Sequence, residues 1–505
     1  MTVLHELVSA AAATAPDRLA VVSDDGTSWT FAEFDRRISC VAAWIAARTD
    51  PGDRVAVVAD NSAAYAALYY GVPRSGRVLT LINQRLSPAE QAAQLDAACP
   101  TLLLGDARYL SALHGLHAHI DRVVTFDSPL WQSAYVDTTR FVDTAVPDDP
   151  AWLLFTSGST GVPKAVVHSH RSILAATMGT VEGRMVAPGG VYLLPFPMCH
   201  IAGYNMLVHH VVASTVVLTA QFRPAAFAEL VDAHGVTSCS LAPTMLHALL
   251  GHLERTGTQL PTLQAIAYGS AAMPLDLLRR AIERLGVDFH QGYGMTETGG
   301  NITFLGPDAH RVGAAGDTEM LTSAGHPHSR AEVGIVDTAG AMLPAGAVGE
   351  IVVRGEQLTP GDWPDGAATV SGWFRTGDIG RIDNRGRLFV VDRLKDIIVT
   401  GGENVSSREV EDALSSHPDV DMVAVVGVPD DYWGEAICAI VVPVAGREPS
   451  ADELIGHVRS TIAAFKRPRL VLFTDALPLT ANGKVAKNRA REYARSAVLG
   501  RAQNP

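Results

Sequence analysis

A short apolar run that ends in a loop of small and hydroxyl residues is the first feature of the chain with evident chemistry. The run ends at Phe155 within FTSGSTGVPKAVVH (155–168), and the loop contains Thr156, Ser157, Gly158, Ser159, Thr160 and Gly161, then Pro163 and Lys164. Small residues let backbone N–H groups approach a polyphosphate, hydroxyls add donors, and the lysine adds a mobile cation. The Walker A spacing is absent. Taken alone, the segment is typical either of a phosphate site or of an ordinary polar turn.

Further motifs follow this loop in order along the chain. They are YGSAAMP (268–274), QGYGMTET (291–298), GWFRTGDIG (372–380), VDRLKDIIVTGGENVSSREVE (391–411) and LPLTANGKVAKNRARE (477–492). Together they resemble the adenylate-forming superfamily, which includes acyl-CoA synthetases, nonribosomal-peptide adenylation domains and firefly luciferase. The resemblance runs from WTFAEF (29–34) to the lysine near 484 and favours the acyl-CoA synthetase and fatty-acid–CoA ligase branch. It implies ATP, Mg²⁺ and coenzyme A as cofactors and an acid–thiol ligase as the activity.

The resemblance also implies which residues bind the nucleotide. Tyr293 would stack on adenine, Thr296 would contact the α-phosphate, Asp378 would accept hydrogen bonds from both ribose hydroxyls, and Arg393 would lie near the ribose. The other expected ATP or AMP contacts come from small, hydroxyl or cationic residues: Thr156, Ser157, Gly158, Ser159, Thr160, Gly161, Lys164, Gly269, Ser270, Ala271, Gly292 and Gly294.

Catalysis by the family depends on a lysine that matches Lys484 in this chain. Its charge would bridge the substrate carboxylate and the α-phosphate as the carboxylate oxygen attacks phosphorus. Glu297 would hold Mg²⁺ together with Thr156, since a hard cation binds carboxylate oxygen beside phosphate oxygens. The alternative is that Lys484 belongs to a solvated basic patch with its neighbours at 487, 489 and 491.

PFPMCHIAGY (195–204) resembles the segment that lines the acyl pocket of the family. His200 matches the gate between this pocket and the thiol tunnel, which Gly402 would border, and it is expected to take part in catalysis. A buried, hydrogen-bonded histidine is the alternative for His200. Lys395 matches the family hinge about which the C-terminal lobe swings. The expected acyl-pocket side chains are Ile201, Tyr204, Met206, Ala267 and Met295.

Two positions depart from the family pattern. The phosphate loop commonly ends Pro-Lys-Gly, whereas this chain has Ala165 after Lys164. The usual Gly-Tyr pair is also missing ahead of Trp373, where the chain has Pro360, Gly361, Asp362 and Trp363. The first change leaves the phosphate-facing residues intact, and the second leaves open the path of that loop but does not affect Asp378.

The acid itself is only narrowed by the sequence. Residues 195–204 contain no Asp or Glu, which disfavours an amino acid, and no Arg or Lys, which disfavours a dicarboxylate. The small and apolar candidate lining favours an apolar monocarboxylate, with a fatty acid ahead of an aryl acid. Three alternatives remain: an acyl-AMP ligase that loads a carrier protein, a luciferase-like oxygenase, and a non-catalytic nucleotide-binding scaffold.

Composition limits the class of protein, its partners and its cellular compartment. The 505 residues carry a net charge of −13, which disfavours nucleic acid as a partner, and 47% are apolar, as in globular proteins. Five scattered cysteines without a CxxC pair argue against disulfides or structural zinc. The start of the chain, 1–17, lacks a signal-peptide pattern, and the apolar window 201–220 is interrupted by polar residues, so it predicts a buried helix running into a strand. These features indicate a cytoplasmic protein without a transmembrane segment, with oligomeric state and peripheral membrane association left open.

The elements that must position these motifs follow from the alternation of short β-branched runs with helical spacing. Strands are expected at 54–59, 77–82, 101–105, 151–156, 191–195, 215–219, 237–242 and 263–269, with helices between them such as 224–234 and 274–285. This pattern predicts an α/β fold with βαβ units and mostly parallel sheets. Beyond 310, strands are expected at 349–355 and 387–392, and a compact α+β lobe after 392. The predicted division is an N-terminal adenylation domain of residues 1–393 and a mobile C-terminal lobe of residues 394–505, joined near 393–396.

Overall fold

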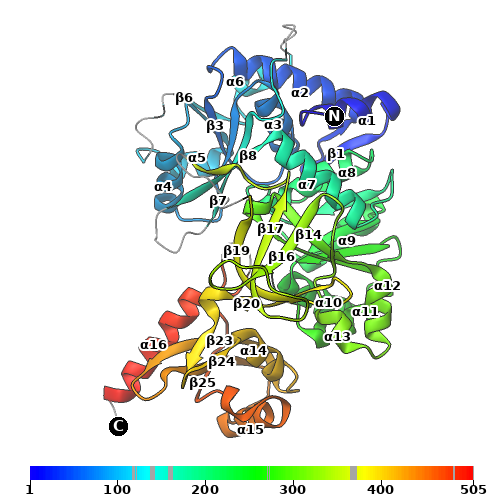
Figure 1. The fold of residues 1–505 in the computed structure, drawn as a ribbon. Coiled ribbons are helices and arrows are strands. Elements are labelled where there is room, and N and C mark those ends of the chain that lie inside the picture. Colours follow the sequence, from blue (N-terminus) through cyan, green and yellow to red (C-terminus); the bar gives the residue numbers. More distant parts are fainter. Residues whose placement is uncertain are drawn as a thin grey trace.

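The structure, a computed structural model, describes residues 1–116, 120, 122–136, 143–156, 163–269, 271, 273–363, 372–480 and 484–503. Within this part of the chain the strands form four sheets. Figure 1 shows the N-terminal part at one end of the molecule and the C-terminal lobe at the other. The predicted α/β fold, with a large N-terminal part and a smaller C-terminal lobe, is confirmed.

The first two sheets are mostly parallel. The nine-stranded sheet contains β15 (His326–Pro327), β14 (Gly300–Leu305), β13 (Asp288–Met295), β12 (Ala265–Gly269), β11 (Ser238–Leu241), β9 (Val191–Leu194), β10 (Thr215–Leu218), β1 (Leu19–Ser23) and β2 (Ser28–Thr30), in that order. The seven-stranded sheet contains β18 (Gly361–Trp363), β8 (Lys164–Ser169), β7 (Pro150–Thr156), β4 (Val78–Leu81), β3 (Arg54–Val58), β5 (Leu102–Gly105) and β6 (Arg122–Thr125). Among the described residues, antiparallel pairing in these two sheets occurs only towards their edges. It involves β14, β15 and β2 in the first sheet and β8 and β18 in the second.

The other two sheets are smaller. An antiparallel sheet contains β16 (Ala331–Val336), β17 (Gly349–Gly355), β19 (Phe374–Ile382) and β20 (Leu388–Arg393). The C-terminal lobe has β22 (Glu403–Val405), β21 (Ile398–Thr400), β24 (Gly434–Pro443), β23 (Val420–Asp430) and β25 (Leu470–Phe473). Every strand run expected from the sequence is present, with ends that agree within one or two residues.

Helices cover the sheets. In the N-terminal part they are α1 (Glu6–Thr14), α2 (Phe31–Ala46), α3 (Ala63–Arg74), α4 (Pro88–Ala98), α5 (Ala107–Ala112), α6 (Pro129–Gln132), α7 (His170–Gly183), α8 (Asn205–His210), α9 (Pro224–His234), α10 (Pro243–Thr256), α11 (Leu275–Leu285), α12 (Pro307–Ala314) and α13 (Thr318–Thr322). The C-terminal lobe has α14 (Ser407–Ser415), α15 (Ala451–Thr461) and α16 (Lys487–Gln503). The window 201–220 forms α8 and β10, as expected, and none of the described helices has the length and apolar character needed to cross a membrane.

Local sequence explains where several of these elements begin. Thr30 caps α2 by accepting a hydrogen bond from the Glu33 backbone, and the Glu33 side chain accepts one from the Thr30 backbone in return. Proline at the first turn begins α9 and α10, where its missing N–H is not needed. Such local signals account for the agreement between expected and observed boundaries.

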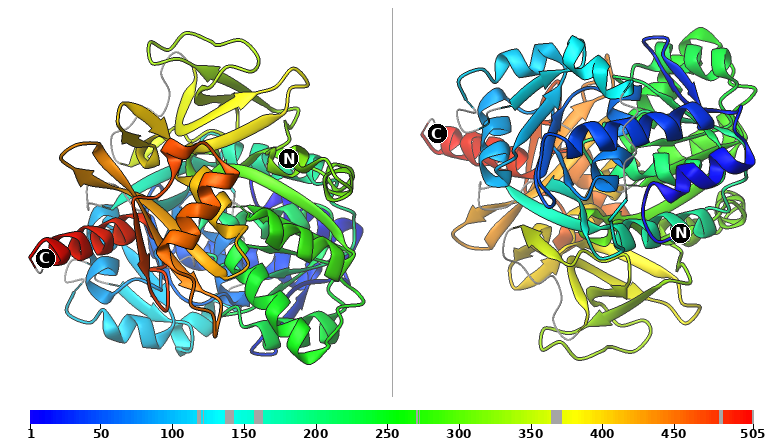
Figure 2. Two further views of the ribbon diagram at one scale, coloured as in Figure 1. Left: turned by 90° about the horizontal axis from the view of Figure 1, so that it is seen from below. Right: turned by 90° about the horizontal axis from the view of Figure 1, so that it is seen from above.

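Buried apolar residues join the two parallel sheets into one body. A single core cluster includes residues of β3, β4 and β7 from the seven-stranded sheet, β1, β9 and β10 from the nine-stranded sheet, and α2, α3, α7 and α8. In the C-terminal lobe, α14 and α15 pack on one face of the sheet and α16 on the other. Figure 2 shows this lobe on the face of the molecule opposite α1. The phosphate-loop motif and the motifs at 268–274 and 291–298 therefore come from two sheets that share a buried core, whereas the C-terminal lobe has core clusters of its own.

Candidate active site

The two strands that flank the phosphate loop form a hairpin. β7 and β8 pair antiparallel, with Thr156 opposite Lys164. Residues 157–162 of the loop lie outside the described residues. The phosphate contacts expected of the loop therefore also lie outside them; they concern Ser157, Gly158, Ser159, Thr160 and Gly161. The apolar residues of β7 are almost entirely buried, which fixes the base of the loop.

The departure at 360–363 forms a third strand beside this hairpin. β18 pairs with β8, and Asp362 stands opposite Val166. From there the Asp362 carboxylate forms an ion pair with the ammonium group of Lys164, whose side chain is 58% exposed. The Ala165 methyl is buried in the cluster that contains Phe155, and Trp363 packs against the same cluster. Ala165 therefore lies in a regular strand, and its methyl contributes to the core.

Backbone hydrogen bonds hold the turn that carries Thr296 and Glu297. His168 Nε2 donates to the Thr296 carbonyl at 2.7 Å, and Thr359 N–H donates to the Glu297 carbonyl at 2.9 Å. Burial lowers the pKa of His168 to about 4, so the ring is neutral at physiological pH. Sequence reasoning missed His168 as a supporting residue, although it ends the loop motif. Its partner is 128 residues away, and no local spacing signals that contact.

The glycines near the expected adenine site are required by strand packing. A Cβ at Gly269 would lie 2.4 Å from the Gly292 carbonyl oxygen, and one at Gly294 would lie 2.0 Å from the Gly300 oxygen. A Cβ at Gly292 would meet the Asn301 amide nitrogen at 2.5 Å. These close approaches between β12, β13 and β14 explain the glycines without a ligand. Ser270 lies outside the described residues.

Three residues expected to bind adenosine meet in one place. The Tyr293 hydroxyl donates to Asp378 Oδ2 at 2.7 Å, and Arg393 Nε lies 3.6 Å from Asp378 Oδ1. Asp378 and Arg393 are opposite each other in β19 and β20, and Asp378 is 5% exposed. Burial raises the pKa of Asp378, while the Tyr293 hydrogen bond and the Arg393 charge lower it. The structure therefore brings together side chains that are up to a hundred residues apart.

Lys484 of the C-terminal lobe acts electrostatically on the same region. Burial and, as the second cause, the charge of Arg393 lower the pKa of Lys484 to about 8. Burial and, after it, the charges of Lys484 and Arg85 lower the pKa of His200 to about 3. Among the described residues, His200 Nε2 has no hydrogen-bond partner. Lys484 therefore lies partly buried near Arg393 and His200, and is not a member of a solvated patch.

The segment expected to be the hinge links the two parts of the chain. Lys395 is exposed in the short turn Leu394–Asp396 that follows β20. Just before it, Asp392 Oδ2 accepts hydrogen bonds from the Ser406 and Ser407 hydroxyls at 3.1 and 2.8 Å. Gly402 is exposed in the turn between β21 and β22, with φ +83° and open space where a Cβ would lie.

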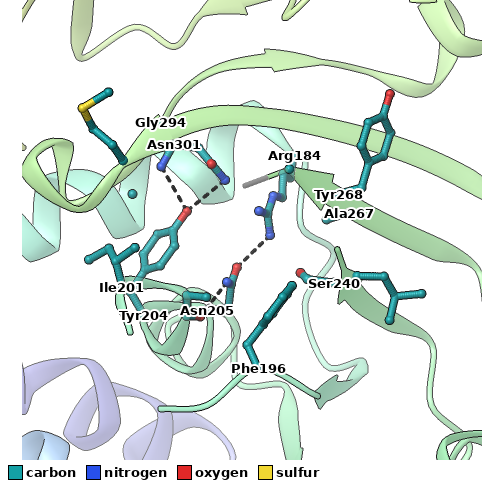
Figure 3. A pocket seen from close by; sticks show the side chains of 15 residues that line it. Arg184, Phe196, Ile201, Tyr204, Asn205, Ser240, Ala267, Tyr268, Gly294 and Asn301 are labelled. Atoms are coloured by element: carbon teal, nitrogen blue, oxygen red, sulfur yellow. Dashed lines mark hydrogen bonds between the residues drawn. The ribbon is translucent and has the colours of Figure 1, made fainter. Parts of the chain in front are cut away.

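A cavity of about 50 Å³ lies between β11, β12, β13 and the segment after β9 (Figure 3). Its lining consists of Arg184, Phe196, Ile201, Ala202, Tyr204, Asn205, Ser240, Leu241, Ala267, Tyr268, Gly269, Gly294, Met295, Gly300 and Asn301. Four of the five expected acyl-pocket side chains are among them; Met206 instead is fully buried in the core. Most of these residues are small, apolar or aromatic, as expected from the sequence, but a buried arginine and three polar side chains, Asn205, Ser240 and Asn301, also contribute. Arg184 follows α7 and so lies outside the segment from which that expectation was made.

The residues proposed for the metal fit its chemistry in part. Burial raises the pKa of Glu297, as does the nearby charge of Asp362, whereas Arg393 and Lys164 lower it. The carboxylates of Glu297 and Asp362 are thus close enough to interact, and Asp362 is paired with Lys164 at the phosphate hairpin. No group of three metal-ligating side chains occurs in the described ranges. Magnesium commonly uses one or two carboxylates together with substrate phosphates, which matches this donor set.

Comparison with known proteins places this geometry in a family. The AMP-binding enzyme family model matches residues 8–363, and the AMP-binding enzyme C-terminal domain model matches residues 409–484. The chain is 34% identical over 481 residues to the feruloyl-CoA synthase of an Amycolatopsis species, covering 93% of this chain and 95% of that protein. It is 32% identical to the fatty acid–[acyl-carrier-protein] ligase ScoC of Streptomyces coeruleorubidus, covering 93% and 92% of the two chains. The solved structure of the amide bond synthetase McbA from Marinactinospora thermotolerans is 30% identical, with a TM-score of 0.87 over 97% of this chain and 99% of that one.

The chain therefore belongs to the AMP-binding enzyme family, and the resemblance to adenylate-forming enzymes is confirmed. The expected enzyme class, an AMP-forming acid–CoA ligase, agrees with relatives that are named as CoA ligases and synthetases. Enzymes of this class use ATP, Mg²⁺ and coenzyme A.

Proposed function

We propose that this protein activates a carboxylic acid with ATP to an acyl-adenylate and transfers the acyl group to coenzyme A. The observation that carries the proposal is the convergence of Lys484, Arg393, Asp378 and Tyr293. They come from three different parts of the chain, and Tyr293 directly precedes Gly294 and Met295 of the cavity lining. A cation, a buried carboxylate and an aromatic ring in this arrangement suit a nucleotide whose α-phosphate is attacked.

In this proposal Tyr293 supports the adenine, Asp378 accepts from the ribose hydroxyls and Arg393 lies near the ribose. Tyr293 donates to Asp378 Oδ2, so Oδ1, the oxygen that faces Arg393, is the one left to accept from the ribose hydroxyls. Thr296 faces the α-phosphate. The remaining proposed phosphate and adenine contacts are Thr156, Ser157, Gly158, Ser159, Thr160, Gly161, Lys164, Gly269, Ser270, Ala271, Gly292 and Gly294.

Lys484 is proposed to act in the first half-reaction. Its ammonium group bridges the carboxylate of the acid and the α-phosphate, and so stabilises the charge that develops as oxygen attacks phosphorus. Glu297, with Thr156, is proposed to hold Mg²⁺. When bound, this cation neutralises phosphate charge and so makes the phosphorus easier to attack.

The second half-reaction is proposed to use the C-terminal lobe differently. Residues 394–505 rotate about Lys395 against residues 1–393, so that Lys484 leaves and Gly402 comes to border a path for the thiol. His200 stands between that path and the acyl cavity. Because its ring is neutral, it can turn without moving a charge through the protein interior.

The acid is proposed to be compact beyond its carboxylate. A cavity of about 50 Å³ accepts a few water-sized groups, since one water needs roughly 10–15 Å³ by this measure. A long alkyl chain would require the lining to open, so an aryl or short acid fits better than the fatty acid favoured from the sequence. The similarity to a feruloyl-CoA synthase and to a fatty acid–carrier-protein ligase keeps both acid types, and a carrier-protein acceptor, as second candidates.

Acid-dependent pyrophosphate release is the direct test. We expect release with a panel of short and aryl acids, and acyl-CoA formation when coenzyme A is added. Lys484→Ala is expected to abolish release, whereas Lys466→Ala, which removes a lobe lysine paired with Glu409, is the matched control. Acyl transfer to a phosphopantetheinylated carrier but not to coenzyme A would favour the carrier alternative. Release at the wild-type rate in Lys484→Ala would overturn the catalytic assignment.

A further inference from the structure

Arg184 is an unusual residue to find in the wall of an acyl cavity. Only 9% of the residue is exposed, and it lines the cavity between Phe196, Asn205 and Ser240. Its Nη1 donates to the Asn205 amide oxygen at 2.8 Å, the contact that is drawn in Figure 3. Nε has no hydrogen-bond partner within the described part of the chain. A guanidinium group remains charged at all physiological pH values.

In the part of the chain that the structure describes, no side-chain anion is paired with this charge. None of the ion pairs among the described residues includes Arg184. The titratable groups on which it acts are themselves basic or phenolic. Burial lowers the pKa of His290 to about 4, with the Arg184 charge as the next cause, and it lowers the pKa of His209 for the same two reasons. A buried charge without a counter-charge is costly, so its presence in a cavity requires an explanation.

The other polar groups in the cavity also supply donors. The Ser240 hydroxyl accepts from Tyr192 at 2.9 Å, so its own hydrogen remains available to a ligand. By contrast, the Tyr204 hydroxyl is already engaged: it accepts from the Asn301 backbone and side-chain nitrogens and shares a hydrogen bond with Thr180. Tyr204 therefore shapes the wall, and Arg184 and Ser240 are the groups that can bind.

From this juxtaposition we propose that Arg184 is the binding site for a second anionic group, a carboxylate at the end of the substrate acid remote from the adenylated one. The proposal rests on the proposed function, because it places the acyl group in this cavity. The substrate class is then a compact dicarboxylic acid. The carboxylate accepts from Arg184 Nε and from Ser240, and so supplies the missing counter-charge. This assignment reverses the sequence-based preference for an apolar monocarboxylate.

The test compares acids that differ only at the remote end. Pyrophosphate release is measured with glutarate against pentanoate, adipate against hexanoate, and terephthalate against 4-methylbenzoate, which separates aliphatic from aromatic chains. For the wild-type protein we expect the diacid of the best-fitting pair to be preferred by about 30-fold or more in kcat/KM, as for a buried charge pair. Arg184→Met keeps the apolar stem and is expected to reverse that preference. Arg184→Lys keeps the charge and is expected to restore part of it.

Thermal unfolding gives a readout that does not depend on turnover. The diacid is expected to raise the melting temperature of the wild-type protein but not of Arg184→Met. In the absence of ligand, Arg184→Met is expected to melt at or above the wild-type temperature, because the substitution removes an unbalanced buried charge. A merely structural arginine would give a lower melting temperature instead.

The outcomes separate this inference from the proposed function. Preference for the methyl-ended acid in every pair, or an unchanged ratio in Arg184→Met, overturns the dicarboxylate site while adenylation itself stands. Absence of acid-dependent pyrophosphate release with any acid overturns the proposed function, and in that case stabilisation of the wild-type protein alone by a diacid still supports the anion site.

Discussion

The charge of Lys484 is expected to be lost within a pH range that kinetics can reach. Burial lowers the pKa of this lysine to about 8 from 10.5, with the charge of Arg393 as the second cause. In the proposed mechanism the adenylation step needs the protonated form of Lys484, because the neutral amine cannot stabilise developing negative charge. The protonated fraction falls as pH rises through the folded-state pKa. We therefore expect kcat/KM for pyrophosphate release to fall with increasing pH through about 8.

The size of the effect follows from the pKa. The lysine is about 90% protonated at pH 7 and about 10% protonated at pH 9, so kcat/KM falls roughly tenfold for each further pH unit. Bound ATP and acid add negative charge near the ammonium group and raise its pKa. The break in kcat, which reports the complex, is thus expected at a higher pH than the break in kcat/KM, which reports the free enzyme.

The measurement is the initial rate of pyrophosphate release with a single acid, taken between about pH 6.5 and 10. Lys484→Arg is the informative variant, because a guanidinium group stays charged throughout this range. Its residual activity, although lower, is expected to lack the break near pH 8. A wild-type kcat/KM that keeps rising to pH 10, or the same break in Lys484→Arg, would refute the reasoning.

Three further substitutions test the surroundings of the site. His168→Phe removes the donor to the Thr296 carbonyl and leaves that oxygen buried and unpaired, so we expect the KM for ATP to rise about tenfold; an unchanged KM would contradict the supporting role. Asp362→Asn releases Lys164 from its ion pair, and the KM for ATP is expected to fall a few-fold, in line with an exposed pair worth about 0–1 kcal/mol, whereas a rise would mean that the carboxylate itself helps to bind ATP. Gly294→Ala forces a Cβ against a strand carbonyl and is expected to cost about 1–3 kcal/mol of unfolding free energy, measured by denaturant titration beside Gly456→Ala, where the Cβ meets open space.

Much of the fold was predictable because its signals are local. The β-branched runs and helical spacing gave strands such as β3 and β17 and helices such as α9 to within a residue or two. The pairing of β18 with β8 was not predictable, because the contact joins segments about 200 residues apart and the sequence there departs from the family pattern. The ion pair between Asp362 and Lys164 follows from that pairing, so it was hidden for the same reason.

The site residues that lie in sequence motifs were predictable, whereas those that depend on three-dimensional packing were not. Tyr293 and Asp378 come from motifs, and their hydrogen bond agrees with the expected shared site. Arg184 belongs to no motif. Its importance comes from the burial of a charged side chain without a paired anion, which only the three-dimensional arrangement reveals. The motifs predict that Gly269 and Gly294 make room for a ligand, yet strand contacts alone require both glycines.

The hydrogen bonds to Asp392 bear on the timing of the proposed lobe rotation between the two half-reactions. This one carboxylate oxygen accepts from Ser406, Ser407 and the backbone N–H of Arg408, all at the start of α14, while Asp392 itself is the last residue but one of β20 in the preceding sheet. Any rotation about Lys395 must break these contacts or turn Asp392 together with the lobe. Together with hydrogen bonds from the Ser406 hydroxyl to the Val391 carbonyl and from Arg408 Nη1 to the Val390 carbonyl, these contacts form a latch that holds the lobe in a defined position, so that its release would be a discrete event. The interval between the two half-reactions would then be set by the opening of this latch, and weakening it through Ser407 would alter the pace of the cycle without touching a group that contacts substrate.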